Sequence, residues 1–330
     1  MTMISRRMFC LSLVWPAMAV RAEGRRPTVG VLLAAPMDRQ LQSNPMGDSN
    51  ARAFSDALRE LGWVDKSSVR VVWRSFELRE EGLPGLVREL AGMPVDVLVV
   101  SGNPGALASR AHSSLKTVIA AAYHPDEYGI VETLSKPGGR ITGALLEPGR
   151  GINAKRIALM KEAVPGLKRF AYLSWRNFRP DVHDEVQGAA SLQDVTAIAA
   201  EVEPDGFPRA FAAALGQGAE AILVGSGGIY YRPEIQAELH GLAIRHRLPV
   251  MHCLLAPGES GGLMAYATDL RENYRVAARM VDRILRGVHP RDIPMEQASK
   301  FVFTVNLAAA RAIGLAMPKS ILLQADRVFE

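Results

Sequence analysis

The sequence predicts an α/β fold made of two doubly wound, Rossmann-like lobes. The chain has 330 residues, which is enough for two domains of ordinary size. Apolar segments of strand length alternate along it with amphipathic segments of helix length. The strand segments are apolar throughout, a pattern typical of parallel strands that helices cover on both faces.

The first series of elements contains four predicted strands, at 28–35, 69–73, 95–100 and 116–121. After the first strand, Phe54, Leu58 and Leu61 recur at helical spacing, and Gly62 fits the glycine that often follows a helix. We expect this series to form one parallel sheet with helices between the strands.

Glycine and proline pairs at 138–139 and 148–149 separate a second series of elements. Strands are expected at 170–174, 195–200 and 219–224, with helices at 157–164, 207–215 and 233–246. The last part, with strands at 263–267 and 301–305 around a helix at 270–287, is too short for a third domain. We expect it to return through the first two lobes.

The domain assignment follows from this order. Residues 27–145 with about 262–297 are assigned to lobe 1, and residues 146–261 with about 298–330 to lobe 2. Several crossings between lobes allow hinge closure. We expect the crossings near 143–150, 256–262 and 297–302.

Residues 1–22 have the three parts of a secretory signal peptide, and we expect them to direct export to the periplasm. Arg6 and Arg7 precede an apolar stretch at 8–20 that is too short to span a bilayer. Small residues follow, and cleavage after Ala19 or after Ala22 fits the pattern. The arginine pair also matches the core of a twin-arginine signal, so both export routes remain open.

Charge and cysteine content exclude several classes of protein. The formal net charge is +5, but the first 22 residues hold three arginines and no acid, which leaves +2 for the rest. No broad basic field remains, and we expect no nucleic-acid partner. Cys10 lies in the leader, so Cys253 has no partner for an intrachain disulfide.

The common chemistry motifs are missing from the chain. It has no phosphate-binding P-loop, and the turn at 36–38 lacks the glycines of a dinucleotide site, so no cofactor is expected. His240, His246 and His252 lie six residues apart without a cysteine pair, and we expect no metal there. Ser260 fits G-x-S-x-G, but a strand follows it where the nucleophile motif needs a helix, so no catalytic residue is assigned.

The turns after the predicted strands are the candidate ligand site, because open α/β sheets bind ligands at the carboxyl ends of strands. Aromatic residues are only 6% of the chain, yet four of its seven tyrosines and one of its four tryptophans lie in or beside these turns. This indicates a pocket wall, although packing residues also occupy strand ends. The residues expected to bind are Ser101, Gly102, Asn103, Tyr123, His124, Trp175, Ser226, Gly227, Tyr230 and Tyr266.

Two interpretations of the Ser101 turn remain open. Asn103 could cap the following helix with Pro104 in its first turn. Alternatively, the glycines at 102 and 105 could expose backbone N–H groups that attract a carboxylate or phosphate. We expect two sets of residues to face each other across the cleft: Ser101, Asn103 and Tyr123 against Trp175, Ser226 and Tyr230.

The chain resembles the tryptophan/tyrosine-type family of ABC transporter substrate-binding proteins, which have the type I periplasmic-binding-protein fold. The matching stretches are 54–63, 95–102, 134–143, 261–266, 274–278 and 319–328. The resemblance implies a secreted protein that binds a small solute between two lobes and delivers it to a membrane permease with a separate ATPase. We expect the protein to be a monomer. An amino acid or an aromatic carboxylate is the expected ligand.

Three departures bear on the ligand. Asn103 stands where the family often has threonine, and His124 precedes Pro125 where it often has aspartate. Gly227 and Gly228 replace the Asp-Asn of tryptophan-type members, so tryptophan itself does not follow. A periplasmic sensor that presents the solute to a receptor fits the same sequence, and a hydrolase on this fold is a further alternative.

Overall fold

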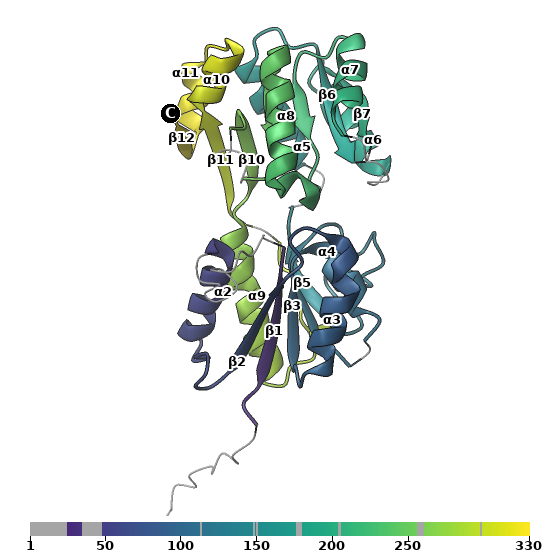
Figure 1. The fold of residues 1–330 in the computed structure, drawn as a ribbon, viewed down its shortest axis with the longest axis vertical. Coiled ribbons are helices and arrows are strands. Elements are labelled where there is room, and N and C mark those ends of the chain that lie inside the picture. The colour runs from purple at the N-terminus through teal and green to yellow at the C-terminus, as the bar shows by residue number, and fades with distance from the viewer. Residues whose placement is uncertain are drawn as a thin grey trace, which may run out of the picture.

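The protein has two lobes joined at a narrow waist (Figure 1). Its structure is a computed structural model that describes residues 25–34, 48–112, 114–147, 149, 151–175, 180–203, 206–255, 261–297 and 299–330. The predicted leader at 1–22 and the predicted loop serine Ser260 lie outside the described residues. In the described part of the chain, no helix is both long and apolar enough to cross a membrane.

Lobe 1 is built, among the described residues, on a five-stranded parallel sheet in the order β2-β1-β3-β4-β5. Its strands are β1 (Thr28–Leu33), β2 (Arg70–Ser75), β3 (Val97–Val100), β4 (Thr117–Ala122) and β5 (Ile141–Leu145). Its helices are α2 (Ser49–Glu60), η2 (Glu80–Gly82), α3 (Leu83–Gly92), α4 (Gly102–Ser109), α9 (Leu270–Leu285) and η5 (Pro290–Asp292).

The sheet of lobe 1 is covered on both faces, as the apolar strands predict. Helices α2 and α9 pack on one face, and α3 and α4 pack on the other. Gly143 allows β5 to lie close to β4, because a side-chain Cβ at this position would be 2.2 Å from the Ile119 carbonyl oxygen. Any other residue at 143 would push the two strands apart.

Lobe 2 is built, within the described ranges, on a seven-stranded sheet in the order β12-β11-β10-β9-β8-β6-β7. Its strands are β6 (Arg169–Trp175), β7 (Thr196–Val202), β8 (Ile222–Val224), β9 (Val250–His252), β10 (Met264–Thr268), β11 (Phe301–Asn306) and β12 (Arg327–Phe329). Its helices are α5 (Ile152–Ala163), α6 (Pro180–Ser191), α7 (Pro208–Gly216), η3 (Gly228–Tyr231), α8 (Pro233–His246), α10 (Leu307–Ile313) and α11 (Lys319–Gln324).

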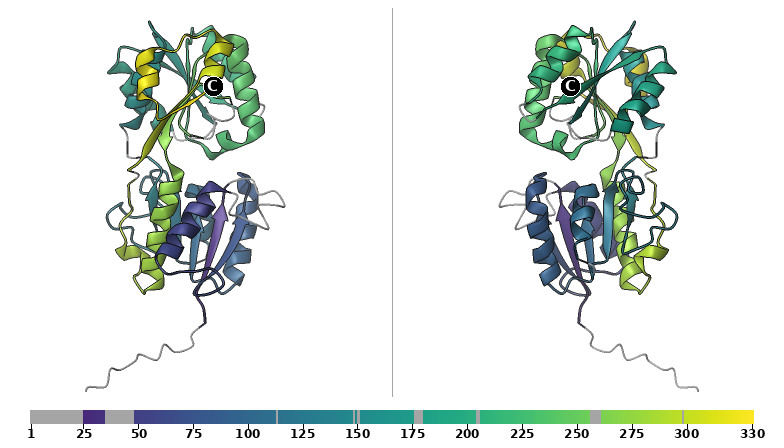
Figure 2. Two further views of the ribbon diagram at one scale, coloured as in Figure 1. Left: turned by 90° about the vertical axis from the view of Figure 1, so that its left-hand side faces the viewer. Right: turned by 90° about the vertical axis from the view of Figure 1, so that its right-hand side faces the viewer.

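Helices cover both faces of the second sheet as well. Helices α5, α6, α10 and α11 pack on one face, while α7 and α8 pack on the other. Strands β10 and β11 are the antiparallel pair of this sheet. They run in opposite directions because the chain leaves lobe 2 after β10, forms α9 in lobe 1, and returns as β11 (Figure 2).

One predicted crossing is wrong. We expected the chain to pass between lobes near 256–262 and lobe 1 to resume at about 262. Instead, β10 pairs with its parallel neighbour β9 inside lobe 2, and the chain passes to lobe 1 only after Thr268. The error arose because a short strand before a long helix fits either lobe by sequence alone.

Hydrogen bonds tie the crossing segments together. The Thr268 hydroxyl, at the end of β10 where the second crossing begins, donates to the Leu146 carbonyl oxygen in the first crossing. The Asp269 N–H donates to the Lys300 carbonyl oxygen of the third crossing at 3.0 Å. The Asn273 side chain in α9 donates to the Leu145 carbonyl oxygen at 2.9 Å. The three crossing segments are therefore hydrogen-bonded to one another and do not form three independent linkers.

Candidate functional site

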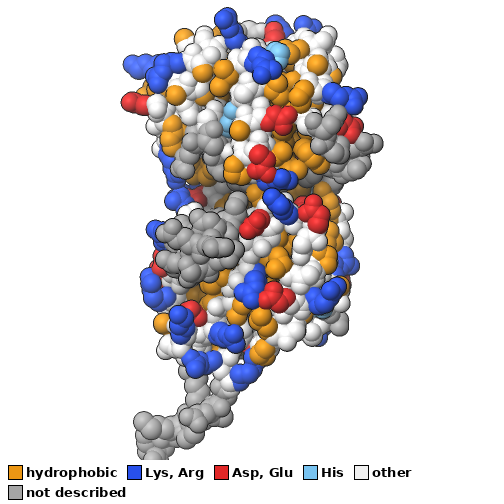
Figure 3. Space-filling model, viewed as in Figure 1, with side chains coloured by type: hydrophobic (Ala, Val, Ile, Leu, Met, Phe, Trp, Pro, Cys, Tyr) orange, Lys and Arg blue, Asp and Glu red, His pale blue; other side chains and the backbone are white. Residues whose placement is uncertain are grey.

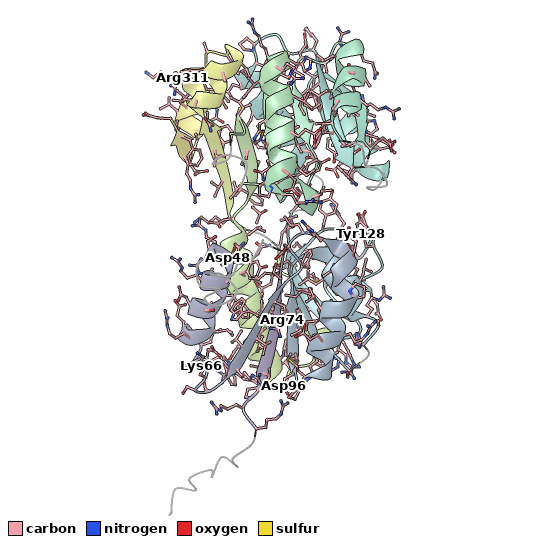
Figure 4. The ribbon with its side chains drawn as sticks, viewed as in Figure 1. Asp48, Lys66, Arg74, Asp96, Tyr128 and Arg311 are labelled. Carbon is pink, nitrogen blue, oxygen red and sulfur yellow. The ribbon has the colours of Figure 1, made fainter. Side chains whose placement is uncertain are left out.

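A cavity of about 600 Å³ lies between the lobes. It is lined by residues at the carboxyl ends of β1, β3 and β4 in lobe 1 and of β6, β8 and β9 in lobe 2. Asp48 and Tyr128 line it from the edge of lobe 1 that faces lobe 2 (Figure 4). The volume lies in the range of ~300–1,000 Å³ that is usual for small-molecule sites.

Seven of the ten residues selected from the sequence line this cavity. They are Ser101, Gly102, Asn103, Tyr123, Trp175, Ser226 and Gly227. They come from four separate strand ends, two in each lobe, and the fold brings them to one space. Whether each of them contacts a ligand stays a prediction.

The other three residues do not line the cavity. Tyr230 is only 2% exposed, and its hydroxyl donates to the Leu173 carbonyl oxygen in the core of lobe 2. Tyr266 stacks on Phe301, with the ring centroids 5.9 Å apart. His124 lies edge-on against the ring of Tyr123. Strand ends also supply packing residues, and these three rings pack instead of facing the cavity.

Asn103 does not cap the following helix, which was the first of the two interpretations of this turn; the second, an anion at the backbone N–H groups, stays a prediction. The N-cap position of α4 belongs to Ser101, and no side chain caps that helix. The Asn103 amide instead pairs with the backbone of Tyr123: its nitrogen donates to the carbonyl oxygen at 2.6 Å, and its oxygen accepts from the N–H at 3.0 Å. This pair fixes the start of α4 to the turn after β4.

The start of α4 nevertheless faces the cavity. Ser101, Gly102 and Asn103 all line it, and Gly102 adopts a left-handed backbone conformation with φ of +76°. The first backbone N–H groups of a helix lack intrahelical partners and attract negative charge. The Ser101 hydroxyl is hydrogen-bonded to the hydroxyl of Tyr274 in α9, and either oxygen can be the donor.

The second-lobe wall rests on a buried ion pair that sequence reasoning missed. The Ser226 hydroxyl donates to Oε1 of Glu147 at 3.1 Å. The same oxygen lies 2.9 Å from Nη2 of Arg156, and Arg156 is fully buried. Glu147 lies in the first crossing and Arg156 in α5. An acid in a connecting segment carries no motif, so the sequence offers no clear signal for this pair.

Arg156 links several segments of lobe 2 that lie behind Ser226, which we call the cavity floor. Its Nε donates to the Tyr266 carbonyl oxygen at 2.9 Å, and its Nη1 donates to Oδ1 of Asn153 at 2.9 Å. Burial by itself lowers the pKa of the Arg156 guanidinium, but the neighbouring Cys253 and Glu147 more than offset it, so the pKa is raised. Arg156 therefore stays charged and holds Glu147 in place.

The adjacent thiol adds no charge to this floor. Burial raises the pKa of Cys253 to about 12, and the charge of Arg156 offsets only part of this rise. The thiol is therefore protonated at neutral pH. The charges below Ser226 are those of Glu147 and Arg156, which balance each other.

The rim of the cavity carries charges of opposite sign on the two lobes. Glu80 and Glu81 line it from lobe 1, and Arg232 lines it from lobe 2. Burial, followed by repulsion from Glu81, raises the pKa of the Glu80 carboxyl. Arg232 is paired with Glu234 on its own lobe at 2.5 Å. Figure 3 shows acidic and basic side chains close together at the waist.

A second buried polar pair lies in lobe 2, away from this cavity. The Nε2 atoms of His240 in α8 and His252 in β9 are 3.2 Å apart. Burial, followed by the neighbouring His240, lowers the pKa of His252 well below its ordinary value. Among the described residues, no group of three or more His, Cys, Asp or Glu side chains is placed to hold a metal ion.

Two α/β lobes, three crossings and a shared cavity define the class of two-lobed ligand-binding proteins. Residues 40–329 match the family described as ABC transporter substrate binding protein. The chain therefore belongs to that family, as its sequence resemblance predicted.

Solved structures of similar proteins share the fold. One is an ABC domain from Streptococcus pneumoniae in complex with L-Trp, at a TM-score of 0.79 and 21% identity, over 92% of this chain and 100% of that one. Another is a ligand-free, open substrate-binding protein with adhesive properties from Clostridium difficile, at a TM-score of 0.68 and 17% identity, over 92% and 99%.

A curated relative is similar over a shorter region. It is a tyrosine-binding protein of Clostridioides difficile strain R20291, 24% identical over 105 residues. The match spans 32% of this chain and 30% of the relative.

Proposed function

We propose that the protein is the exported, periplasmic solute-binding component of an ABC importer. It acts as a monomer, holds a small molecule between its lobes without changing it chemically, and delivers it to a membrane permease driven by a separate ATPase. The observation that carries the proposal is the cavity of about 600 Å³ lined from both lobes. A ligand that contacts both lobes stabilises their closed arrangement over the open one, and a permease can recognise that difference.

The proposed ligand is an amino acid or an aromatic carboxylate. The start of α4 offers backbone N–H groups at the cavity, which suits a carboxylate. Phe76, Tyr128 and Trp175 line the same space and suit an apolar or aromatic body. The L-Trp complex and the tyrosine-binding relative support the same ligand class.

Closure is proposed to bring the two charged rims together. Arg232 of lobe 2 and Glu80 and Glu81 of lobe 1 line the cavity with opposite charges. Their attraction strengthens as the distance between them shortens and water is expelled. The bonded crossings would serve as the hinge, since closure then needs only small backbone rotations at the ends of three segments.

Thermal-shift measurements with amino acids and aromatic carboxylates, followed by small-angle scattering on the best compound, test the proposal. A true ligand at 100 times its Kd should stabilise the protein by about 2.7 kcal/mol, and the radius of gyration should fall when it binds. If no compound raises the melting temperature, the proposed ligand class is wrong. An unchanged radius with bound ligand contradicts hinge closure.

A matched pair of variants locates the site. Trp175→Ala removes part of the cavity wall and should weaken binding at least tenfold. Leu192→Ala removes an apolar side chain that is 86% exposed in lobe 2 and should leave the affinity unchanged. Equal affinities for the two variants would place the ligand elsewhere.

A further inference from the structure

The Ser226 hydroxyl has a fixed direction. A serine hydroxyl carries one proton, so it can donate one hydrogen bond and accept others through its lone pairs. In this structure the proton goes to Oε1 of Glu147 at 3.1 Å. Ser226 itself lines the cavity, so the part of its oxygen that remains for a ligand can only accept.

Several groups prevent this hydroxyl from turning around. Hydrogen bonds to charged acceptors are stronger than those between neutral groups. The Glu147 side chain is only 4% exposed, so it has little water to replace a lost donor. Arg156 donates to the same carboxylate oxygen as Ser226, and it is anchored by the Tyr266 carbonyl oxygen and by Asn153. Turning the Ser226 proton toward a ligand would leave a buried carboxylate with one donor fewer.

We propose that Ser226 is a specificity-determining residue that accepts a hydrogen bond from the ligand, and that Glu147 is the positioning residue that sets this polarity through the Glu147–Arg156 ion pair. This inference rests on the proposed function. It predicts a ligand that offers an N–H or O–H donor to lobe 2, which for a free amino acid is the ammonium group. A carboxylate oxygen in the same place would face a lone pair of the Ser226 oxygen and would be repelled.

The first lobe supplies the complementary end of the ligand. The Ser101 hydroxyl shares its hydrogen bond with the Tyr274 hydroxyl, and either of the two can donate. Ser101 can therefore turn its proton toward a carboxylate while the Tyr274 proton bonds to it, and the start of α4 also favours an anion. The amino acid would lie with its carboxylate toward lobe 1 and its ammonium group toward Ser226.

Two probes that differ in one group test the polarity. L-tryptophan and indole-3-propionate share the indole ring and the carboxylate, and only L-tryptophan has the α-amino group. Calorimetric titration gives the Kd of each probe for the wild-type chain, Ser226→Ala and Ser226→Thr. We expect the wild type to bind L-tryptophan at least tenfold more tightly than indole-3-propionate, and Ser226→Ala to reduce this ratio about fivefold or more.

The conservative variants separate positioning from simple structural support. Ser226→Thr keeps the hydroxyl and should keep the ratio of the two Kd values. Glu147→Gln keeps an oxygen that Arg156 and Ser226 can share but removes its charge, so the Ser226 proton is held less firmly and can turn toward the cavity. It should therefore lower the ratio while indole-3-propionate binds as well as before or better, whereas a merely structural role would weaken both probes equally. Ser226→Ala leaves the ion pair in place if Glu147→Gln fails to fold.

Each result decides a separate point. If the wild type binds both probes with equal Kd values, or if Ser226→Ala keeps the ratio, the assigned polarity is overturned while the proposed function stands. The same ratio of Kd values is measured for L-leucine and 4-methylpentanoate, which also differ only in the α-amino group. If the wild type binds none of the four compounds, the proposed amino-acid ligand is overturned, and the inference falls with it.

Discussion

The two serines that line the cavity differ in what holds them. Ser101 in lobe 1 is paired with the neutral hydroxyl of Tyr274, so the hydrogen bond can run in either direction. Ser226 in lobe 2 donates to a carboxylate that a fully buried arginine holds. The same residue type therefore presents an adaptable group on one wall and a fixed acceptor on the other. The surroundings of a polar side chain, more than its identity, decide what it can recognise.

The largest expected effect comes from breaking the ion pair below Ser226. Arg156→Met leaves Glu147 buried without its partner and should lower the free energy of unfolding by about 3–5 kcal/mol. Tyr274→Phe, the matched change in lobe 1, should cost only about 0.5–1.5 kcal/mol. Urea unfolding measures both variants.

A double variant checks the cause of that loss. Arg156→Met combined with Glu147→Gln removes the stranded charge and should recover part of the stability. If Arg156→Met alone costs no more than Tyr274→Phe, the contrast between the two walls is wrong.

A smaller effect is expected at the neutral anchor of lobe 1. Asn103→Ala leaves the N–H and the carbonyl oxygen of Tyr123 without their amide partner, which should cost about 2 kcal/mol. Gln324→Ala removes an exposed amide that donates to Glu162 and should change stability by less than about 0.5 kcal/mol. Thermal unfolding of both variants provides the measurement. Equal melting temperatures would mean that the Asn103 pair does not hold the turn after β4.

The smallest expected effect depends on pH and concerns the second polar pair of lobe 2. The pKa of His252 is lower in the folded protein than in the unfolded chain, mainly because the residue is buried. As the pH falls below about 6.5, the unfolded chain takes up a proton that folded His252 does not. Stability is therefore present at neutral pH and is lost on acidification, by at most about 1.4 kcal/mol per pH unit for this proton.

Unfolding curves between pH 7 and pH 5 test this dependence. His252→Gln removes the titrating group and should flatten the loss of stability with falling pH. The control Leu192→Ala changes an exposed side chain of lobe 2 that does not titrate and should keep the wild-type slope. Identical slopes for wild type and His252→Gln would contradict the assignment.

Much of the fold could be predicted because its signals are local. Apolar runs such as 28–35 and 95–100 are too short for helices and too apolar for exposed strands, so a parallel sheet was the remaining choice. The helix expected at 233–246 agrees with α8 (Pro233–His246) in both bounds. The crossing after β10 could not be placed, because β10 pairs not only with β9 but also with β11, which follows α9 in the chain.

The candidate site was predictable only in outline. We selected ten residues with the rule that ligands bind at strand ends, and seven of them line the cavity, because parallel strands end at one edge of a sheet. The same rule could not separate Trp175, which lines the cavity, from Tyr230, which packs in the core. Side-chain direction at a strand end depends on the helix packed beside it, and the local sequence does not encode this.

The sequence alone determined the class of fold, the number of lobes and the edge of each sheet that lines the cavity, because hydrophobic periodicity and turn residues act over a few positions. Only the tertiary structure decided which hydroxyl can donate and which can only accept. Glu147 and Arg156 are nine residues apart, but Ser226 lies 79 residues beyond Glu147 and meets them only once lobe 2 has folded. Burial then removes the competing water and fixes the direction of their hydrogen bonds.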